Sequence, residues 1–215
     1  MHRVRDLTLP GMRRSLGTRL GEGIGMRKAI ELAGVLLAAL LLGIFATTPP
    51  QSRDSRTSAR DFSAARAMND VAAIASAPHP TASAENARVR AYLAMRMQAL
   101  GMEVSSDSGA VGDWGTKRLA RWSGRPVAPI TLTNVIGVLP GKDRTLPAVV
   151  LMAHHDTVWG SPGAADDSAG IAASLEVVRA IRAQGQPRRD LIVLATDAEE
   201  LGLEGAEHFF ASHPL

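Results

Sequence analysis

An apolar run without a single charged residue extends from Leu32 to Ala46 and separates a basic N-terminus from the rest of the chain. With its flanking residues, from 29 to 48, it approaches the roughly 20 residues that a helix needs to span a bilayer. Pro49 and Pro50 end such a helix, because proline lacks a backbone N–H. The run therefore predicts one transmembrane helix over residues 29–48, ahead of a separate globular region.

The charge distribution gives this helix an orientation. Residues 1–28 contain seven basic and two acidic side chains, a net charge of +5, whereas the whole 215-residue chain carries +3. Everything after residue 28 is therefore slightly acidic, at −2, which argues against a nucleic-acid partner. Basic residues beside a transmembrane helix stay in the cytoplasm. We expect residues 1–28 to be cytoplasmic and the globular region to be extracytoplasmic, either periplasmic or lumenal.

A cleaved signal peptide is the alternative interpretation of the same run. Its apolar core would be shorter, and it would end in a small-x-small cleavage site. The residues around Ala46 read Ile44-Phe45-Ala46 and provide no such site, so an uncleaved anchor is favoured. Met26, directly before Arg27 and Lys28, is also a plausible true start of the protein.

Residues 49–61 are polar and predict a solvated linker, and the pattern becomes globular from residue 62. The chain has no cysteine, which excludes disulfides and zinc–thiolate sites. Helical and extended patterns then alternate, which predicts an α/β sheet. The predicted helices cover residues 64–75, 84–100, 171–181 and 203–212; the predicted strands cover 130–139, 148–153 and 190–196, with a further strand beginning in 102–105 and no assignment for 106–126.

Polar clusters follow the predicted strands, which is where ligands bind in open α/β sheets. His154 ends one strand and can present a ring nitrogen to a metal, while Asp156 can accept the other ring N–H. Asp166 lies in a Gly- and Ala-rich segment, and its two carboxylate oxygens can bridge two cations. Each pattern alone also has a structural interpretation, as a loop or core histidine and as an N-capping Asp.

Glu199 and Glu200 follow the strand at 190–196. Adjacent carboxylates after a buried strand usually lie in a solvated loop. Near a divalent cation the pair has a chemical use, because one carboxylate binds the metal and the other takes a proton from the bound water.

In order, the three clusters read His-x-Asp, Gly-Ala-x-Asp-Asp and Glu-Glu-x-Gly-Leu-x-Gly, within LMAHHDTVWGSPGAADDSAG and LIVLATDAEELGLEGAEHF. This combination resembles the M28 family of zinc metallopeptidases. The likeness continues upstream through TNVIGVLP and APHPTASAENARVRAYL to about residue 62. Together with the N-terminal anchor, it is most similar to the endoplasmic-reticulum-metallopeptidase-like membrane branch and its bacterial relatives, which often carry later membrane helices.

The resemblance implies a mixed α/β sheet sandwiched by helices, with residues 62–215 as the N-terminal part of a peptidase domain. It implies two Zn²⁺ ions, with His154 on one, Glu200 on the other and Asp166 bridging both. Asp156 would orient His154, and Glu199 would be the general base. The implied activity is that of an aminopeptidase acting on peptides. The family site needs a further Asp and His beyond Leu215, so we expect residues 1–215 alone to be inactive.

Other interpretations remain at this point. An M20-like amidohydrolase uses similar ligands but usually carries Lys after the bridging Asp region, where this chain has Ser168-Ala169-Gly170. A glutaminyl cyclase shares the M28 fold, and a catalytically inactive M28-like ectodomain could act as a binding module. Substrate preference and oligomeric state are not indicated. Structural roles are expected for His79 and His155, and surface positions for His208 and His213.

Overall fold

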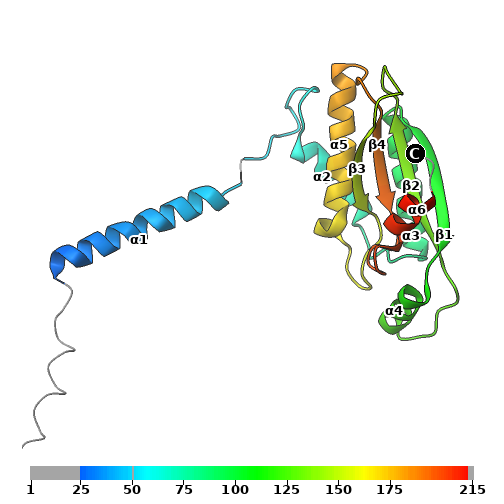
Figure 1. Cartoon of the computed structure of the whole chain (residues 1–215), viewed down its shortest axis with the longest axis horizontal. Coiled ribbons are helices and arrows are strands. Elements are labelled where there is room, and N and C mark those ends of the chain that lie inside the picture. The colour runs from blue at the N-terminus through cyan, green and yellow to red at the C-terminus, as the bar shows by residue number, and fades with distance from the viewer. Residues whose placement is uncertain (1–24, 50, 213–215) are drawn as a thin grey trace, which may run out of the picture. The chain divides into compact units, whose positions relative to one another are not determined.

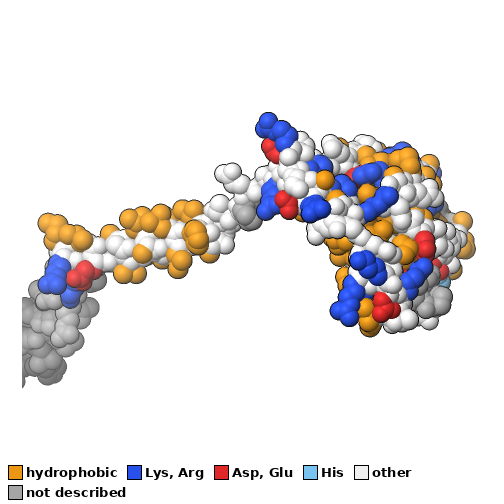
Figure 2. Space-filling model, turned by 90° about the horizontal axis from the view of Figure 1, so that it is seen from above, with side chains coloured by type: hydrophobic (Ala, Val, Ile, Leu, Met, Phe, Trp, Pro, Cys, Tyr) orange, Lys and Arg blue, Asp and Glu red, His pale blue; other side chains and the backbone are white. Residues whose placement is uncertain are grey.

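The computed structural model describes residues 25–49 and 51–212. The chain divides into two units between Gln51 and Ser52. In the first unit, helix α1 covers Met26–Thr47, with a mean hydropathy of 2.4 in its most apolar window and no buried side chain. Figure 2 shows apolar side chains along this helix and charged ones at its N-terminal end. By length and composition, α1 is sufficient to cross a membrane.

The second unit is built on a four-stranded sheet with the order β1-β2-β4-β3. Strands β1 (Glu103–Ala110), β2 (Thr131–Leu139) and β4 (Leu191–Thr196) pair antiparallel in succession. Strand β3 (Val149–His154) pairs parallel with β4, and His154 lies beside Thr196 in that register. The sheet is therefore mixed, and the parallel pair carries its C-terminal ends to one edge of the fold (Figure 1).

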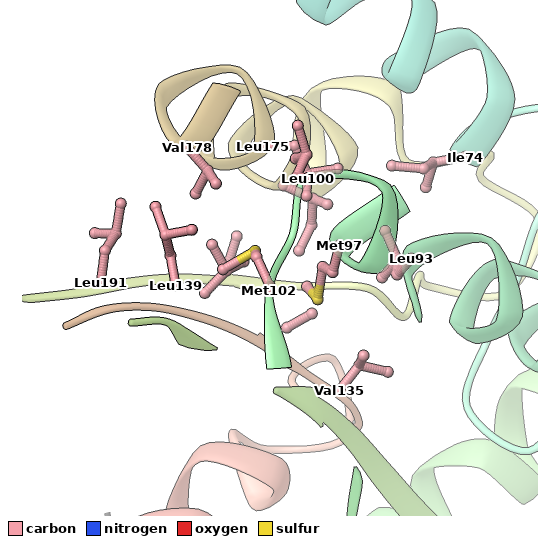
Figure 3. Packing of buried hydrophobic residues seen from close by; sticks show 14 of the residues in the cluster. Ile74, Leu93, Met97, Leu100, Met102, Val135, Leu139, Leu175, Val178 and Leu191 are labelled. Carbon is pink, nitrogen blue, oxygen red and sulfur yellow. The ribbon is translucent and has the colours of Figure 1, made fainter. Parts of the chain in front are cut away.

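Helices cover both faces of this sheet. On one face, α3 (Ala84–Ala99) and α5 (Ala169–Gln184) enclose the main core, with α2 (Ala64–Ile74) packed against α5. On the other face, Phe209 of α6 (Glu204–Ser212) packs on apolar residues of β2 and β4. Figure 3 shows the main core, in which Met97, Leu175 and Leu139 lie between the helices and the sheet. The predicted helix-sandwiched α/β fold is confirmed.

Helices α2 and α3 each begin directly after a serine whose side chain caps the helix. Ser63 accepts a hydrogen bond from the Arg66 N–H at the start of α2, and Ser83 accepts one from the Asn86 N–H at the start of α3. A side-chain oxygen here satisfies a backbone donor that has no partner within the helix. Both helices begin at the predicted residue and end one residue before the predicted end.

Helix α4 (Asp113–Ser123) lies within the stretch that the sequence left unassigned. The helical pattern of this stretch is hard to recognise in the sequence, because Gly115 is a poor helix former and lies near the start of α4. A Cβ at Gly115 would lie 2.4 Å from a carboxylate oxygen of Glu204 and 3.1 Å from Leu201. Close packing against Leu201 and Glu204 therefore favours glycine here. Two tryptophans of α4 flank Arg118, whose guanidinium lies 5.1 and 4.7 Å from the ring centroids of Trp114 and Trp122.

Part of the predicted linker is held against α2 and α5. Arg66 donates to the carbonyl oxygens of Ser55 and Thr57 at 2.9 and 2.8 Å, and Arg179 donates to that of Ala59 at 2.6 Å. Both arginines also pair with Glu176, whose side chain is buried. Residues 53–61 therefore belong to the second unit and are bonded to α2 and α5 through their backbone carbonyls.

Candidate metal centre

His154 is placed by the end of β3, where its ring is buried at 7% exposure. The ring Nδ1–H donates to the backbone carbonyl of Asp156 at 3.0 Å, which leaves Nε2 as the nitrogen available to a metal. The carboxylate of Asp156 lies 3.6 Å from Nδ1. The sequence predicted that this carboxylate would accept the ring N–H. In the structure the shorter contact is to the backbone oxygen of the same residue.

Asp166 reaches His154 from the turn before α5. Its Oδ1 lies 2.9 Å from His154 Nε2, and its side chain is 81% exposed. Gly163, with φ of 64°, begins this turn, and the following Asp167 accepts the N–H of Gly170 at 2.9 Å as a cap of α5. The segment thus places one carboxylate at Nε2 of His154 and the next at the helix start.

Glu199 and Glu200 lie in the loop after β4, and their backbone is bonded to Asp156. Oδ1 of Asp156 accepts the Glu199 N–H at 3.0 Å, and Oδ2 accepts the Glu200 N–H at 3.2 Å. The Glu199 carboxylate comes within 3.8 Å of His154 Nε2. The Asp156 carboxylate therefore contacts all three residues: it lies close to the His154 ring and accepts the backbone N–H groups of both glutamates.

His154, Asp166 and Glu200 each offer one ligand atom, and the three atoms lie within 4.8 Å of one another. Within residues 25–49 and 51–212 it is the single such group of three. One imidazole and two carboxylates suit Zn²⁺, which accepts nitrogen and oxygen ligands. The geometry thus brings together the three residues that the sequence proposed as ligands, and this donor set fits zinc.

The charges of the cluster also favour a cation. Burial raises the pKa of the Glu200 carboxyl, and the neighbouring carboxylates of Asp156 and Asp166 raise it further by repulsion. Burial lowers the pKa of His154, but its contacts with Asp156, Asp166 and Glu199 outweigh this and raise it to about 10. A positive charge is therefore stabilised at this position, and a metal ion that binds there replaces the His154 proton.

The other described histidines lie outside this group. His155 is buried, donating from Nε2 to the Thr133 carbonyl at 3.0 Å, with Nδ1 3.3 Å from the Asn86 side-chain nitrogen. His79 is buried too, donating from Nδ1 to the Ala77 carbonyl at 2.8 Å, and burial lowers its pKa. His208 is half-buried rather than on the surface, 3.2 Å from Asp107. His213 lies outside the described residues.

Three polar residues beneath the site were not singled out from the sequence. Thr81, Asn86 and Asp197 are all buried, and all bond to the loops that carry the candidate ligands or to one another. Asp197 sits two residues before Glu199, and Thr81 and Asn86 lie in the upstream stretch APHPTASAEN. Asp197 had a signal in the sequence, because it is an acidic residue at the junction between a predicted strand and the loop that follows.

The stretch of sequence that carries the candidate ligands matches a known family model. Residues 134–215 fit the model described as peptidase family M28. The chain belongs to the M28 family of metallopeptidases. The M28 assignment confirms the resemblance stated from the sequence, and it disfavours the M20-like alternative. The matched range contains every candidate ligand named above and leaves out the upstream residues Thr81 and Asn86.

Relatives of this M28 chain include fungal vacuolar membrane proteases. The protein from Schizosaccharomyces pombe is 35% identical over 161 residues, covering 73% of this chain and 18% of that protein. The protein from Yarrowia lipolytica is 30% identical over 206 residues, covering 90% of this chain and 20% of that protein. The M28 chain therefore spans about a fifth of the length of these relatives.

Solved structures share the fold of the M28 chain. A zinc aminopeptidase from Bacillus subtilis aligns with a TM-score of 0.57 at 17% identity, covering 71% of this chain and 66% of that chain. A glutaminyl cyclase from Porphyromonas gingivalis aligns with the same TM-score and identity, covering 72% of this chain and 57% of that chain. At such identities the likeness establishes the fold and leaves the choice between the two reactions open.

Proposed function

We propose that this M28 chain forms part of a membrane-anchored dizinc aminopeptidase. The observation that carries the proposal is the convergence of His154, Asp166 and Glu200 within 4.8 Å, with Glu199 3.8 Å from the same imidazole. Three ligands and one additional carboxylate come from three separate segments. A purely structural polar cluster would not need a surplus of negative charge around one buried histidine.

The proposed ligand arrangement assigns His154 to one zinc and Glu200 to the other, with Asp166 shared between them. The exposed side chain of Asp166 lies on the open side of the cluster, where a substrate can approach. An Asp and a His from outside residues 1–215 would complete the two ligand sets. Residues 1–215 alone are accordingly proposed to bind zinc weakly and to be inactive.

Bound zinc supplies Lewis acidity, which lowers the pKa of a water molecule and polarises the peptide carbonyl. Glu199 takes a proton from the attacking water on its carboxylate and delivers it to the leaving amine nitrogen. Asp156 keeps this carboxylate in place through the Glu199 N–H. The products are a free amino acid and a peptide shortened by one residue, if the substrate presents its N-terminal residue to the cluster.

Helix α1 is proposed to be the membrane anchor, with residues 1–28 in the cytoplasm and the peptidase region outside it. The support is the length and hydropathy of α1 together with the basic residues that precede it. The fungal relatives bear the name of membrane proteases, which agrees with this arrangement.

A substrate panel on the full-length protein tests the reaction class. An aminoacyl anilide with a free amine, its N-acetylated counterpart and a peptide with N-terminal glutamine are compared before zinc removal, after chelation and after zinc is restored. The proposal expects zinc-dependent release of aniline from the free-amine substrate alone. Cyclisation of the glutamine peptide without anilide hydrolysis would indicate a cyclase, and zinc binding without any turnover would indicate a binding module.

A further inference from the structure

The connection between α2 and α3 forms a polar floor beneath the candidate site. His79 and Thr81 come from this connection and Asn86 from the first turn of α3; their exposed fractions are 1%, 3% and 0%. The backbone N–H of His79 donates to the Thr157 hydroxyl at 3.0 Å, just after the His154–Asp156 stretch. The upstream sequence motif thus contacts the metal-site loop, although it supplies none of the candidate ligands.

Thr81 lies between two buried carboxylates. Its hydroxyl oxygen is 3.2 Å from Oδ2 of Asp156 and 3.1 Å from Oδ1 of Asp197. Asp156 and Asp197 are 1% and 0% exposed, so their carboxylates are shielded from bulk water. Buried carboxylates are stabilised by hydrogen bonds to their oxygens, and an unmet acceptor in such a place is costly.

The hydroxyl has one proton, so it donates to one of the two carboxylates at a time. Asp197 has other donors: the Ala198 and Thr133 N–H groups at 2.9 Å each, and the Asn86 amide at 3.4 Å. Oδ2 of Asp156, in contrast, has the Glu200 N–H and Thr81 as its donors. Loss of the hydroxyl would therefore affect Asp156 more than Asp197.

We propose that Thr81 is a positioning residue for the reaction: its hydroxyl holds the Asp156 carboxylate, and Asp156 in turn holds the Glu199–Glu200 loop. The proposal rests on the proposed function for its kinetic consequences. Its structural consequence, tighter bonding of the Glu199 and Glu200 N–H groups, is independent of zinc and of turnover. Thr81 acts through Asp156 and contacts neither the substrate nor a proposed ligand.

Two substitutions separate the hydroxyl from the shape of the side chain. Thr81→Val keeps the volume and removes the hydroxyl, whereas Thr81→Ser keeps the hydroxyl and removes a methyl group. Thr145→Val is the matched control, because the Thr145 hydroxyl also bonds a carboxylate, that of Asp143 at 2.6 Å, on an exposed loop before β3. If Thr81→Val does not fold, Thr81→Ala takes its place with the same expected results.

The experiment measures three properties of the full-length protein: kcat and KM on an aminoacyl anilide, zinc affinity by chelator competition, and amide hydrogen exchange at Glu199 and Glu200 without zinc. For Thr81→Val we expect kcat or zinc affinity to fall about 10- to 100-fold, as is usual when an outer partner of a metal site is lost. KM should change little, and both amides should exchange faster. Thr81→Ser and Thr145→Val should match wild type in all three.

Unchanged exchange and unchanged kcat in Thr81→Val would overturn the positioning role. Equal defects in Thr81→Ser and Thr81→Val would also overturn it, because they would trace the effect to the methyl group. A wild-type protein that neither binds zinc nor turns over substrate would refute the proposed function alone. In that case the exchange rates at Glu199 and Glu200 still decide whether Thr81 holds the loop.

Discussion

The carboxylate of Asp156 accepts the backbone N–H of Glu199 at 3.0 Å, across 43 residues of sequence. The same carboxylate accepts the Glu200 N–H and lies 3.6 Å from the ring of His154. Orientation of the histidine is therefore one part of what Asp156 does. It also bonds the backbone of both glutamates in the loop after β4, so one side chain links candidate ligands from two strand ends.

Replacing Asp156 should therefore disturb metal binding more than a histidine contact alone would suggest. In Asp156→Asn, one carboxylate oxygen becomes an NH₂ group, which cannot accept a backbone N–H. We expect zinc affinity to fall by about 10- to 100-fold, measured by chelator competition. Asp143→Asn, on an exposed loop before β3, is the matched control and should retain wild-type affinity. Equal affinity in the two variants would contradict this role of Asp156.

The buried Glu176 should contribute strongly to stability at neutral pH. Its carboxylate accepts from the Ser63 N–H at 2.9 Å and pairs with Arg66 and Arg179 at 3.1 and 2.6 Å. In Glu176→Gln we expect a loss of about 2 to 3 kcal/mol, typical of hydrogen bonds to a charged group. Glu85→Gln, a partly exposed helix pair with Arg88, should lose less than about 0.5 kcal/mol. Thermal unfolding of the protein compares the two variants.

The effect of Glu176 should also depend on pH. Burial opposes its ionisation, but Arg179, the Ser63 N–H and Arg66 outweigh burial and hold the pKa of Glu176 below its ordinary value. A lowered pKa in the folded state adds stability above the unfolded pKa, and this is lost as pH falls through the folded pKa. The gap between wild type and Glu176→Gln should therefore shrink below about pH 4.5. A gap that is constant from pH 7 to pH 3 would contradict this.

Gly205 is predicted to tolerate no side chain. A Cβ at this position would lie 2.0 Å from the Asp197 carbonyl oxygen and 2.6 Å from the Asn134 side chain. Gly205→Ala should destabilise the protein by about 1 to 3 kcal/mol through overpacking. Gly112→Ala is the control, because its Cβ would meet Glu204 at ordinary contact distances of 3.5 Å and beyond. Similar melting temperatures for the two variants would show that the start of α6 can shift.

The proposed membrane anchor, α1, makes a separate prediction about topology. Alkaline phosphatase, which is active only after export, should be active when it is fused after Ser52. A cytoplasmic reporter at the same position should be inactive. Replacing Arg27 and Lys28 with glutamine should weaken this orientation, because fewer basic residues would remain beside the apolar run. The reverse pattern of reporter activity would contradict an extracytoplasmic peptidase region.

The strands, and the polar residues that lie together at their ends, were predictable because their signals are local. The apolar run that ends at His154 predicts one strand, and the run before Glu199 predicts another. In both cases the run and the polar residues at its end lie within ten residues of sequence. Long-range effects were not predictable in this way. Helix α4 depends on close packing of Gly115 against Leu201 and Glu204, and the bonding of residues 53–61 depends on Arg66 and Arg179.

The floor of the site shows the same limit. Thr81 precedes Asp156 by 75 residues, and its role between two carboxylates becomes visible only when the α2–α3 connection folds beneath β3 and β4. The sequence predicted a contact between the Asp156 carboxylate and the His154 ring, but it did not indicate that the backbone oxygen of Asp156 lies nearer to Nδ1, at 3.0 Å against 3.6 Å.

The most direct test of the proposed mechanism compares Glu199→Gln with Glu200→Gln in the full-length, zinc-loaded protein. Glutamine keeps the shape of Glu199 but cannot take a proton, so turnover should fall about 100- to 10,000-fold while zinc content stays near two per chain. Glu200→Gln should instead lose zinc, because it removes a proposed ligand. Turnover of Glu199→Gln within tenfold of wild type, or loss of zinc equal to that of Glu200→Gln, would contradict a general-base role for Glu199.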